Sequence, residues 1–311
     1  MIWSISESRT FKRCQRQWYY KNVLANAKAK DSLRHHAYLL SKLRSISAWR
    51  GNIVDSVITD RVIPAIKARR KYTVQEAKTS ALQLFDSQLA IARQHPLRDP
   101  SVSPSKNGAG FVVFHSMEYG GQISEEDVLR ARREVETAIE NLFSMHSLLS
   151  VISSSKQLIA QRPLCFPHSG ATVRAVPDLI ALYTDQPPII IDWKVHVFGV
   201  REAWLQLAVY ALALTRCKPH VDFPQSLARW TASDIRLMEA QLLTKKLRQY
   251  SLTEEELDRS EAYIADSVTQ ILLTIGEQDR TQLKGEDFRV TSSPDNCGRC
   301  AFRGICWEEK V

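Results

Sequence analysis

The chain has 311 residues, of which 44% are hydrophobic and 24% are charged, and its formal net charge is +8 at pH 7. This composition predicts a folded protein with a substantial core and argues against a disordered chain. No apolar run approaches the roughly 18 residues that a membrane helix needs, and the first residues lack the pattern of a signal peptide. We therefore expect a cytoplasmic protein with no membrane partner, and the positive charge favours a polyanion such as DNA.

The first half of the sequence is predicted to be mostly helical. Residues 2–22 have the pattern of one capped helix, and residues 46–70 have the pattern of another. An apolar stripe on the second helix consists of Trp49, Ile53, Val57 and Ile58. The segment 95–122 begins with many Pro, Ser and Gly residues, which predicts a mobile loop. Ser124, followed by three acids, predicts the start of a helix that runs to about residue 150.

The second half of the sequence predicts a mixed sheet flanked by helices. Three strand-like runs come first, at residues 158–166, 172–183 and 189–194. A helix at residues 204–214, a further strand at residues 235–243 and a capping box at Thr253 and Glu256 follow them. The capping box predicts a helix to about residue 275, and the order of elements predicts an α/β fold.

Two acids and one lysine are the candidate catalytic residues. A turn at residues 186–188 makes the runs around Asp178 and Asp192 resemble the two strands of a hairpin, which would place the acids on neighbouring strands. Side chains alternate along a strand, so Asp192 and Lys194 are predicted to point to the same face. Carboxylates hold Mg²⁺ well, and an amine beside the metal can position a water molecule for phosphodiester hydrolysis. The alternative interpretation is two surface acids on a hairpin and a solvated lysine.

Pro177-Asp178 together with Asp192-Trp193-Lys194 resembles the core motif of the PD-(D/E)XK nuclease superfamily. The resemblance implies a restriction-endonuclease-like mixed sheet flanked by helices, with a helical N-terminal region. It also implies a Mg²⁺- or Mn²⁺-dependent DNase that leaves a 5′-phosphate. Asp178, Asp192 and the backbone carbonyl of Trp193 would hold the metal, and Lys194 would orient or activate the attacking water.

Two further positions extend the predicted site. Gln206 and Tyr210 lie four residues apart on a predicted helix and so share a face. They resemble the Q-x₃-Y motif of RecB-like nucleases, which implies a polar pair over the active site that can meet the DNA backbone. The alternative is an amphipathic helix on which Gln206 is merely solvated.

Asp55 lies on the predicted helix at residues 46–70, a few residues after a glycine. Members of the resembled family often have a histidine there as an extra metal ligand. An aspartate can bind Mg²⁺ or Mn²⁺ at least as well as a histidine, because hard cations prefer oxygen. Asp55 is therefore a candidate metal ligand, and an ordinary surface acid of the helix is the alternative.

Three cysteines lie within ten residues near the end of the chain, at Cys297, Cys300 and Cys306. A tetrahedral metal site or a cluster needs four soft ligands, and Cys14, Cys165 and Cys217 are the candidates for the fourth. The segment around Cys14 resembles the first helix of the RecB-like iron–sulfur branch, which includes AddB-type and CRISPR-associated nucleases. That resemblance implies that Cys14 joins the three late cysteines around a [4Fe–4S] cluster in a C-terminal tail at residues 290–311. Zinc is the chemical alternative.

These observations predict one nuclease domain over residues 1–311, with a mostly helical part at 1–150 and a nuclease core at 156–275. Its predicted role is DNA cleavage in repair, recombination or antiviral defence. The sequence contains no Walker A loop, so a helicase or another effector subunit would have to supply strand separation. A catalytically vestigial scaffold subunit and a zinc-stabilised adaptor that binds only protein are the alternatives.

Overall fold

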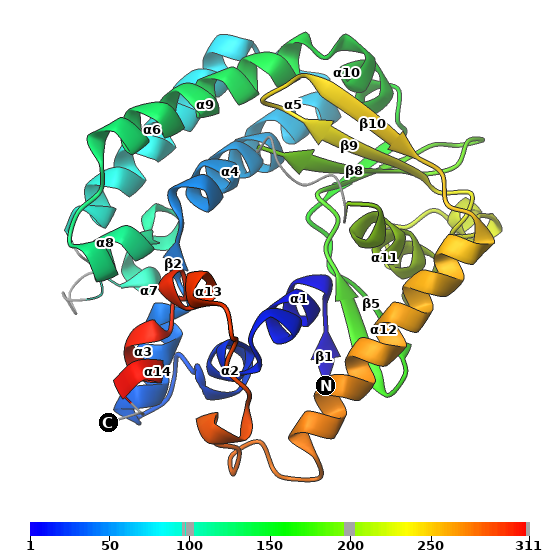
Figure 1. Ribbon diagram of the computed structural model, residues 1–311. Coiled ribbons are helices and arrows are strands. Elements are labelled where there is room, and N and C mark those ends of the chain that lie inside the picture. The colour runs from blue at the N-terminus through cyan, green and yellow to red at the C-terminus, as the bar shows by residue number, and fades with distance from the viewer. Residues whose placement is uncertain (95–96, 98–102, 196–202, 309–311) are drawn as a thin grey trace. The chain divides into compact units, whose positions relative to one another are not determined.

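The computed structural model describes residues 1–94, 97, 103–195 and 203–308. The chain divides into two compact units (Figure 1). We call residues 1–3, 46–86 and 125–265 the sheet unit, and residues 4–45, 87–124 and 266–311 the cysteine unit. Within the described ranges, no helix is both long enough and apolar enough to cross a membrane.

A five-stranded sheet is the centre of the sheet unit, with the strand order β10-β9-β8-β7-β4. Its strands are β4 (Gln157–Ala160), β7 (Leu179–Leu182), β8 (Ile189–Lys194), β9 (Arg236–Gln241) and β10 (Lys246–Tyr250). β8 and β9 run parallel and the other neighbours run antiparallel, so the sheet is mixed, as predicted. A smaller sheet has the order β1-β6-β5, formed by β1 (Ile2–Trp3), β6 (Ala171–Ala175) and β5 (Leu164–His168).

The central strands form because their residues are apolar on both faces. All four residues of β7 are buried, and so are the first five residues of β8. A strand covered on both sides has a nearly continuous apolar run, and its backbone groups are satisfied by pairing with neighbouring strands. The predicted strand at 189–194 is confirmed at these bounds, and its interior position explains why the acid at its end is buried.

Several helices belong to the sheet unit. α4 (Ile46–Val57) continues through the π-helical segment η2 (Ile58–Val62) into α5 (Ile63–Lys67), which confirms the helix predicted at 46–70 and its buried stripe. The others are α9 (Glu125–Ser144), α10 (His146–Ser153), α11 (Ala203–Arg216) and the short 3₁₀ helix η4 (Gln225–Arg229). α6 (Val74–Ala92) and α12 (Glu254–Ile275) have residues in both units. The predicted capping box forms, because the Glu256 N–H donates to Thr253 and the Thr253 N–H donates to Glu256.

Two of the predicted strands are wrong as single elements. The run at 158–166 divides into β4 and β5, and the run at 172–183 divides into β6 and β7. In each case the two halves belong to different sheets. Gln161 has a left-handed backbone with φ 50°, and Pro177 cannot donate a ladder hydrogen bond, so both runs are interrupted between the sheets. The helix predicted to reach residue 150 also breaks, at Met145 between α9 and α10.

The cysteine unit consists mainly of short helices. Near the N-terminus these are α1 (Ile5–Arg13), α2 (Gln15–Tyr19), the π-helical η1 (Tyr20–Leu24) and α3 (Ser32–Leu40). Further along are α7 (Pro104–Asn107), η3 (Gly108–Gly110), α8 (His115–Gly120), η5 (Gly285–Asp287), α13 (Pro294–Gly298) and α14 (Arg303–Glu308). A parallel pair joins β2 (Leu43–Arg44) and β3 (Val113–Phe114).

The single helix predicted at 2–22 is wrong in one respect that matters for the cysteines. The chain starts with a two-residue strand, and the helix is interrupted at Cys14, which has the extended angles φ −163° and ψ 110°. Cys14 therefore ends α1 and begins α2, which turns its side chain away from a continuous helix face. The mobile loop predicted at 95–122 lies partly outside the described residues, and from residue 104 onwards it contains α7, η3, β3 and α8.

Candidate active site

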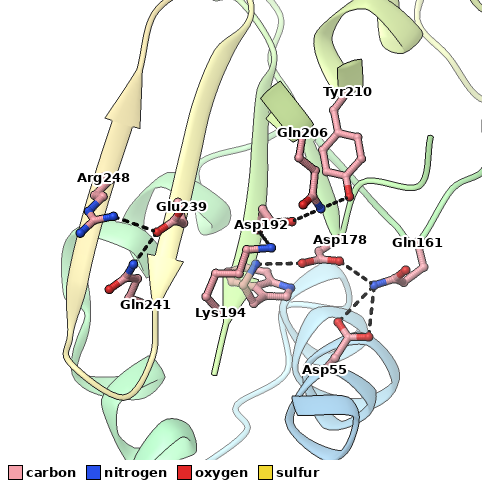
Figure 2. A network of polar contacts seen from close by, with 11 residues as sticks. Asp55, Gln161, Asp178, Asp192, Lys194, Gln206, Tyr210, Glu239, Gln241 and Arg248 are labelled. Carbon is pink, nitrogen blue, oxygen red and sulfur yellow. Dashed lines mark hydrogen bonds and ion pairs between the residues drawn. The ribbon is translucent and has the colours of Figure 1, made fainter. Parts of the chain in front are cut away.

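The two candidate acids come from adjacent strands of the five-stranded sheet. Asp178 lies immediately before β7 and Asp192 lies near the end of β8, and these strands pair antiparallel with Leu179 opposite Ile191. The backbone N–H of Trp193 donates to Oδ2 of Asp178 at 2.8 Å, which fixes the carboxylate against the neighbouring strand. The hairpin predicted from the sequence therefore places both acids side by side (Figure 2).

Lys194 and Asp192 point to the same face, as strand alternation predicts. Nζ of Lys194 forms an ion pair with Oδ2 of Asp192 at 2.5 Å. Asp192 is only 2% exposed, so this pair lies in a less polar environment than a surface salt bridge. The contact keeps a positively charged ammonium group close to the carboxylates of Asp178 and Asp192. We call these two residues, together with Asp55, the acidic cluster.

Helix α11 carries Gln206 and Tyr210, the two residues that were predicted to extend the site. Nε2 of Gln206 donates to Oδ1 of Asp192 at 3.2 Å and to the hydroxyl of Tyr210 at 2.6 Å. The two helix residues therefore share a face and reach the carboxylate as a connected pair. Gln206 is a partner of the acidic cluster and not merely a solvated helix residue.

Asp55 on α4 also reaches the cluster, through a residue that the sequence did not indicate. Nε2 of Gln161 donates to both carboxylate oxygens of Asp55, at 3.1 and 3.2 Å, and to Oδ1 of Asp178 at 3.1 Å. The Gln161 N–H also donates to the Asp178 carbonyl at 3.1 Å. Gln161 stands alone at the break between two strands, so no motif spacing marks it; only its left-handed backbone sets it apart in the structure.

Burial and mutual repulsion shift the pKa values of these acids upward. Burial, followed by the charges of Asp192 and Asp55, raises the pKa of Asp178 to about 8. Burial likewise raises the pKa of Asp55 to about 6, against the opposing hydrogen bond from Gln161. Three carboxylates brought this close in a poorly solvated place disfavour their own ionisation. A bound cation would remove that penalty.

A pocket of about 380 Å³ opens beside these residues. Its wall includes Asp55, Asp178, Asp192 and Lys194, together with Gly51 on α4. A side chain at Gly51 would meet no atom within 4 Å, so this part of the wall borders open space. The cluster is therefore accessible to a ligand from one side while its acids remain largely buried.

Arg50 connects the helix that carries Asp55 to the end of β8. Its Nη1 forms an ion pair with Glu134 on α9, and its Nη2 donates to the carbonyl of Val195. Arg50 itself is buried. The guanidinium group therefore fixes α4 against the chain segment directly after Lys194, and Arg50 precedes Asp55 by five residues on this helix.

The donor chemistry of the acidic cluster suits a hard divalent cation, because it offers several carboxylate oxygens and the pKa values disfavour leaving them uncompensated. In the described part of the chain, however, no three His, Cys, Asp or Glu side chains stand in the arrangement of a metal site. Gln161 and Lys194 engage the oxygens that a cation would use. The carboxylates are brought together but are held by protein donors.

Four of the six cysteines border one small cavity in the cysteine unit. Cys14, Cys297, Cys300 and Cys306 line a space of about 20 Å³, and all are free thiols. Cys165 is exposed and Cys217 is buried elsewhere, so neither reaches this cavity. The thiols do not stand in a ligand arrangement within the described residues, and the C-terminal segment that carries three of them contains the short helices α13 and α14.

Two of these thiols accept long hydrogen bonds from backbone N–H groups. Cys14 accepts from the Gln17 N–H at 3.5 Å, and Cys300 accepts from the Phe302 N–H at 3.4 Å. Burial, and then the neighbouring thiols, raises the pKa of Cys300 to about 11, and burial also raises the pKa of Cys306. Thiols in such surroundings stay protonated unless a metal takes the place of the proton.

The family model of the PD-(D/E)XK nuclease superfamily matches residues 2–307, and the chain belongs to this superfamily. No curated protein matches the sequence. A solved structure titled "Crystal structure of SSO0001" aligns at 13% identity and a TM-score of 0.28, covering 62% of this chain and 78% of that chain. An alignment this weak supports no statement on fold or function.

Membership in the superfamily confirms the predicted superfamily, the predicted fold class and the predicted general chemistry. The fold is a mixed α/β fold of the PD-(D/E)XK type, and the superfamily consists of nuclease-like phosphodiesterases. Its members are usually metal-dependent and typically use Mg²⁺ or Mn²⁺. The match does not extend to the RecB-like iron–sulfur branch that the N-terminal segment and the cysteines suggested.

Proposed function

We propose that this chain is a Mg²⁺- or Mn²⁺-dependent DNase. The observation that carries the proposal is the contact of Asp192 with Lys194 on one strand, beside Asp178 at the start of the adjacent strand. This arrangement occurs in a chain of the PD-(D/E)XK superfamily, where hydrolysis of phosphodiester bonds is the common chemistry. The net charge of +8 favours a polyanionic substrate.

In this proposal Asp178, Asp192 and the Trp193 carbonyl hold the cation, with Asp55 as a further oxygen ligand. When bound, such a cation would supply Lewis-acid polarisation of the scissile phosphate and would make a water molecule easier to deprotonate. The raised pKa values of Asp178 and Asp55 support the assignment, because a compensating positive charge would favour the ionised form of both carboxylates.

Lys194 orients the attacking water and stabilises negative charge that develops on the phosphate. Its ion pair with Asp192 holds the ammonium at the cluster before any substrate arrives. Gln206 holds the Asp192 carboxylate in one orientation, and Tyr210 holds the Gln206 amide in turn. These last two residues act as positioning residues and lie on the helix where they can also meet the DNA backbone.

The decisive experiment is cleavage of labelled DNA by purified protein with Mg²⁺, with Mn²⁺ and with EDTA. We expect cleavage that depends on the cation and that Asp192→Ala abolishes without unfolding the protein. Asp185→Ala is the matched control, because Asp185 is 85% exposed in the turn between the same two strands. DNA binding by the wild-type protein without any cleavage would instead identify a catalytically vestigial scaffold. Comparison of circular with linear DNA then separates internal cutting from cutting at ends.

We also propose that Cys14, Cys297, Cys300 and Cys306 bind a [4Fe–4S] cluster. Support comes from their four thiols bordering a single cavity, although Cys14 is separated from the others by most of the chain. Anaerobically purified protein should contain about four irons per chain. Stoichiometric zinc without iron would identify the alternative metal, and absence of both would overturn the site.

The proposed setting is DNA repair, recombination or antiviral defence, with a helicase or another effector subunit as partner. This part of the proposal depends on the sequence alone. A tagged protein should recover an ATP-driven strand-separating partner from native cells, and the recovery should be lost when the cysteine unit is disrupted by Cys14→Ser.

A further inference from the structure

A row of polar side chains crosses the sheet from the acidic cluster to the edge strand. In the register of the sheet, Asp192 on β8 pairs with Glu239 on β9, and Glu239 pairs with Arg248 on β10. Paired residues of adjacent strands point to the same face, so these three side chains form one line on the face that carries Lys194. Figure 2 shows them on three adjacent strands.

Glu239 is a buried acid that the proposed reaction does not use. It is 1% exposed, and its Oε1 accepts a hydrogen bond from Nε2 of Gln241 at 2.6 Å. Nη1 of Arg248 lies 3.6 Å from the same oxygen. A carboxylate buried this deeply needs a nearby positive charge, and Arg248 provides it.

The ion pair leaves hydrogen-bonding capacity on the arginine. A distance of 3.6 Å is too long for a hydrogen bond, and within the described residues neither Nη1 of Arg248 nor Oε2 of Glu239 has a hydrogen-bond partner. The Arg248 side chain is nevertheless 30% exposed. Nη1 itself is buried beside Glu239, so the part of this anchored arginine that can meet an incoming acceptor is the rest of its guanidinium group.

The position of Arg248 in the sheet indicates which chemical group would bind to it. Arg248 lies two strands from Asp192, which corresponds to about 10 Å in a sheet. A substrate that places one phosphate at the acidic cluster carries further phosphates along its backbone within this reach. The planar fork of arginine matches the geometry of phosphate oxygens, and phosphate is the anionic group of a nucleic-acid backbone.

We infer that Arg248 binds a backbone phosphate of the nucleic-acid strand next to the scissile phosphate, and that Glu239 is the positioning residue that holds Arg248 in the row. This inference rests on the proposed nuclease function and adds a specific substrate contact to it. Arg236 provides the matched control, because it is an exposed arginine on β9 whose position in the strand puts it on the opposite face.

The test is binding of a fluorescently labelled single-stranded oligonucleotide, measured by anisotropy in EDTA across a series of KCl concentrations. Arg248→Ala should weaken binding about tenfold, the scale of a hydrogen bond to a charged group. It should also reduce the slope of log K against log salt by about 0.7, which is the share of one neutralised phosphate on a single strand. Arg236→Ala should change neither quantity. Arg248→Lys retains the charge, and so keeps the buried acid paired, but should still weaken binding because the fork is removed.

For Glu239→Gln, the direction of the change in binding affinity tests the role of Glu239. Removal of a negative charge near a polyanion strengthens binding if Glu239 acts only through its charge. If Glu239 positions Arg248, the substitution weakens binding a few-fold, and in the Arg248→Ala background it has no further effect.

The outcomes separate this inference from the proposed function. A wild-type protein that binds no nucleic acid overturns both. A wild-type protein that binds, with Arg248→Ala and Arg248→Lys indistinguishable from Arg236→Ala, overturns only the role of Arg248. Tighter binding by Glu239→Gln overturns the positioning role of Glu239. Circular dichroism and thermal melting of each variant confirm that the comparison is between folded proteins.

Discussion

The acidic cluster and the cysteine cavity are organised in opposite ways. The carboxylates of Asp178 and Asp192 are held by protein donors, among them the Trp193 N–H, the amides of Gln161 and Gln206, and the Lys194 ammonium. The cysteine thiols have long contacts with backbone N–H groups and border a cavity of only about 20 Å³. The protein itself fixes the carboxylates of the first site, whereas the proposed cluster would hold the thiols of the second site together. Substitutions in the first should therefore affect reaction rate, and substitutions in the second should affect folding.

The largest effect is expected at Cys14. In the proposed cluster, Cys14 would contribute binding energy that stabilises the fold and would link the start of the chain to its end. Cys14→Ser should lower the free energy of unfolding by more than about 4 kcal/mol, a scale typical of the removal of a metal centre. Chemical denaturation checks this under anaerobic conditions, with Cys165→Ser as the control because Cys165 is exposed and outside the cavity. Equal stability of the two variants would show that the cavity binds nothing structural.

The next largest effect is expected at Lys194, on the rate of DNA cleavage. Lys194→Ala should lower this rate at least ~10²-fold, because a positioned electrostatic or proton-transfer group is removed. Its DNA affinity should change little. Lys156→Ala, a substitution of an exposed lysine in the same unit, should retain full rate. Full cleavage activity of purified Lys194→Ala would remove Lys194 from the mechanism.

A smaller effect is expected at Asp55 and its partner Gln161. Asp55→Ala should raise the Mg²⁺ concentration required for half-maximal cleavage, and Asp55→His should partly restore it with a shift toward Mn²⁺, because imidazole suits softer ions. Gln161→Ala should raise the same concentration roughly tenfold, the lower end of the effect of removing a residue that orients a metal ligand. Unchanged metal titrations for both Asp55→Ala and Gln161→Ala would assign Asp55 to the helix surface.

The smallest effect on stability is expected from Asp178→Asn, and it should be a gain. Burial raises the pKa of Asp178 from its ordinary value of 3.8 to about 8, so the ionised group opposes folding. The stability of the wild-type protein in EDTA should therefore fall as the pH rises through this window, because the favourable protonated form is lost. Asp178→Asn should melt a few degrees higher than wild type, about 2–4 °C for each kcal/mol gained, with a larger difference at pH 8 than at pH 5. Thermal melting in EDTA at the two pH values checks this, and Asp185→Asn is the exposed control.

Local sequence determined much of the acidic site. The apolar run before Asp192 predicts a buried strand, and strand alternation then places Asp192 and Lys194 on one face without any further information. The four-residue spacing of Gln206 and Tyr210 likewise predicts their shared helix face. Each of these relations lies within a single element, where backbone geometry fixes which side chains meet.

Only the tertiary structure decided the contacts that join separate elements. The hydrogen bonds of Gln161 to Asp55 and Asp178 depend on a strand break that the apolar pattern did not reveal. The alignment of Asp192 with Glu239 and Arg248 depends on the register of three strands, and no local pattern of residues fixes the parallel pairing of β8 with β9. The sequence therefore determined the chemistry of each element, because that depends on residue type and spacing. The tertiary structure decided which elements share a site, because that depends on the packing of segments far apart in the chain.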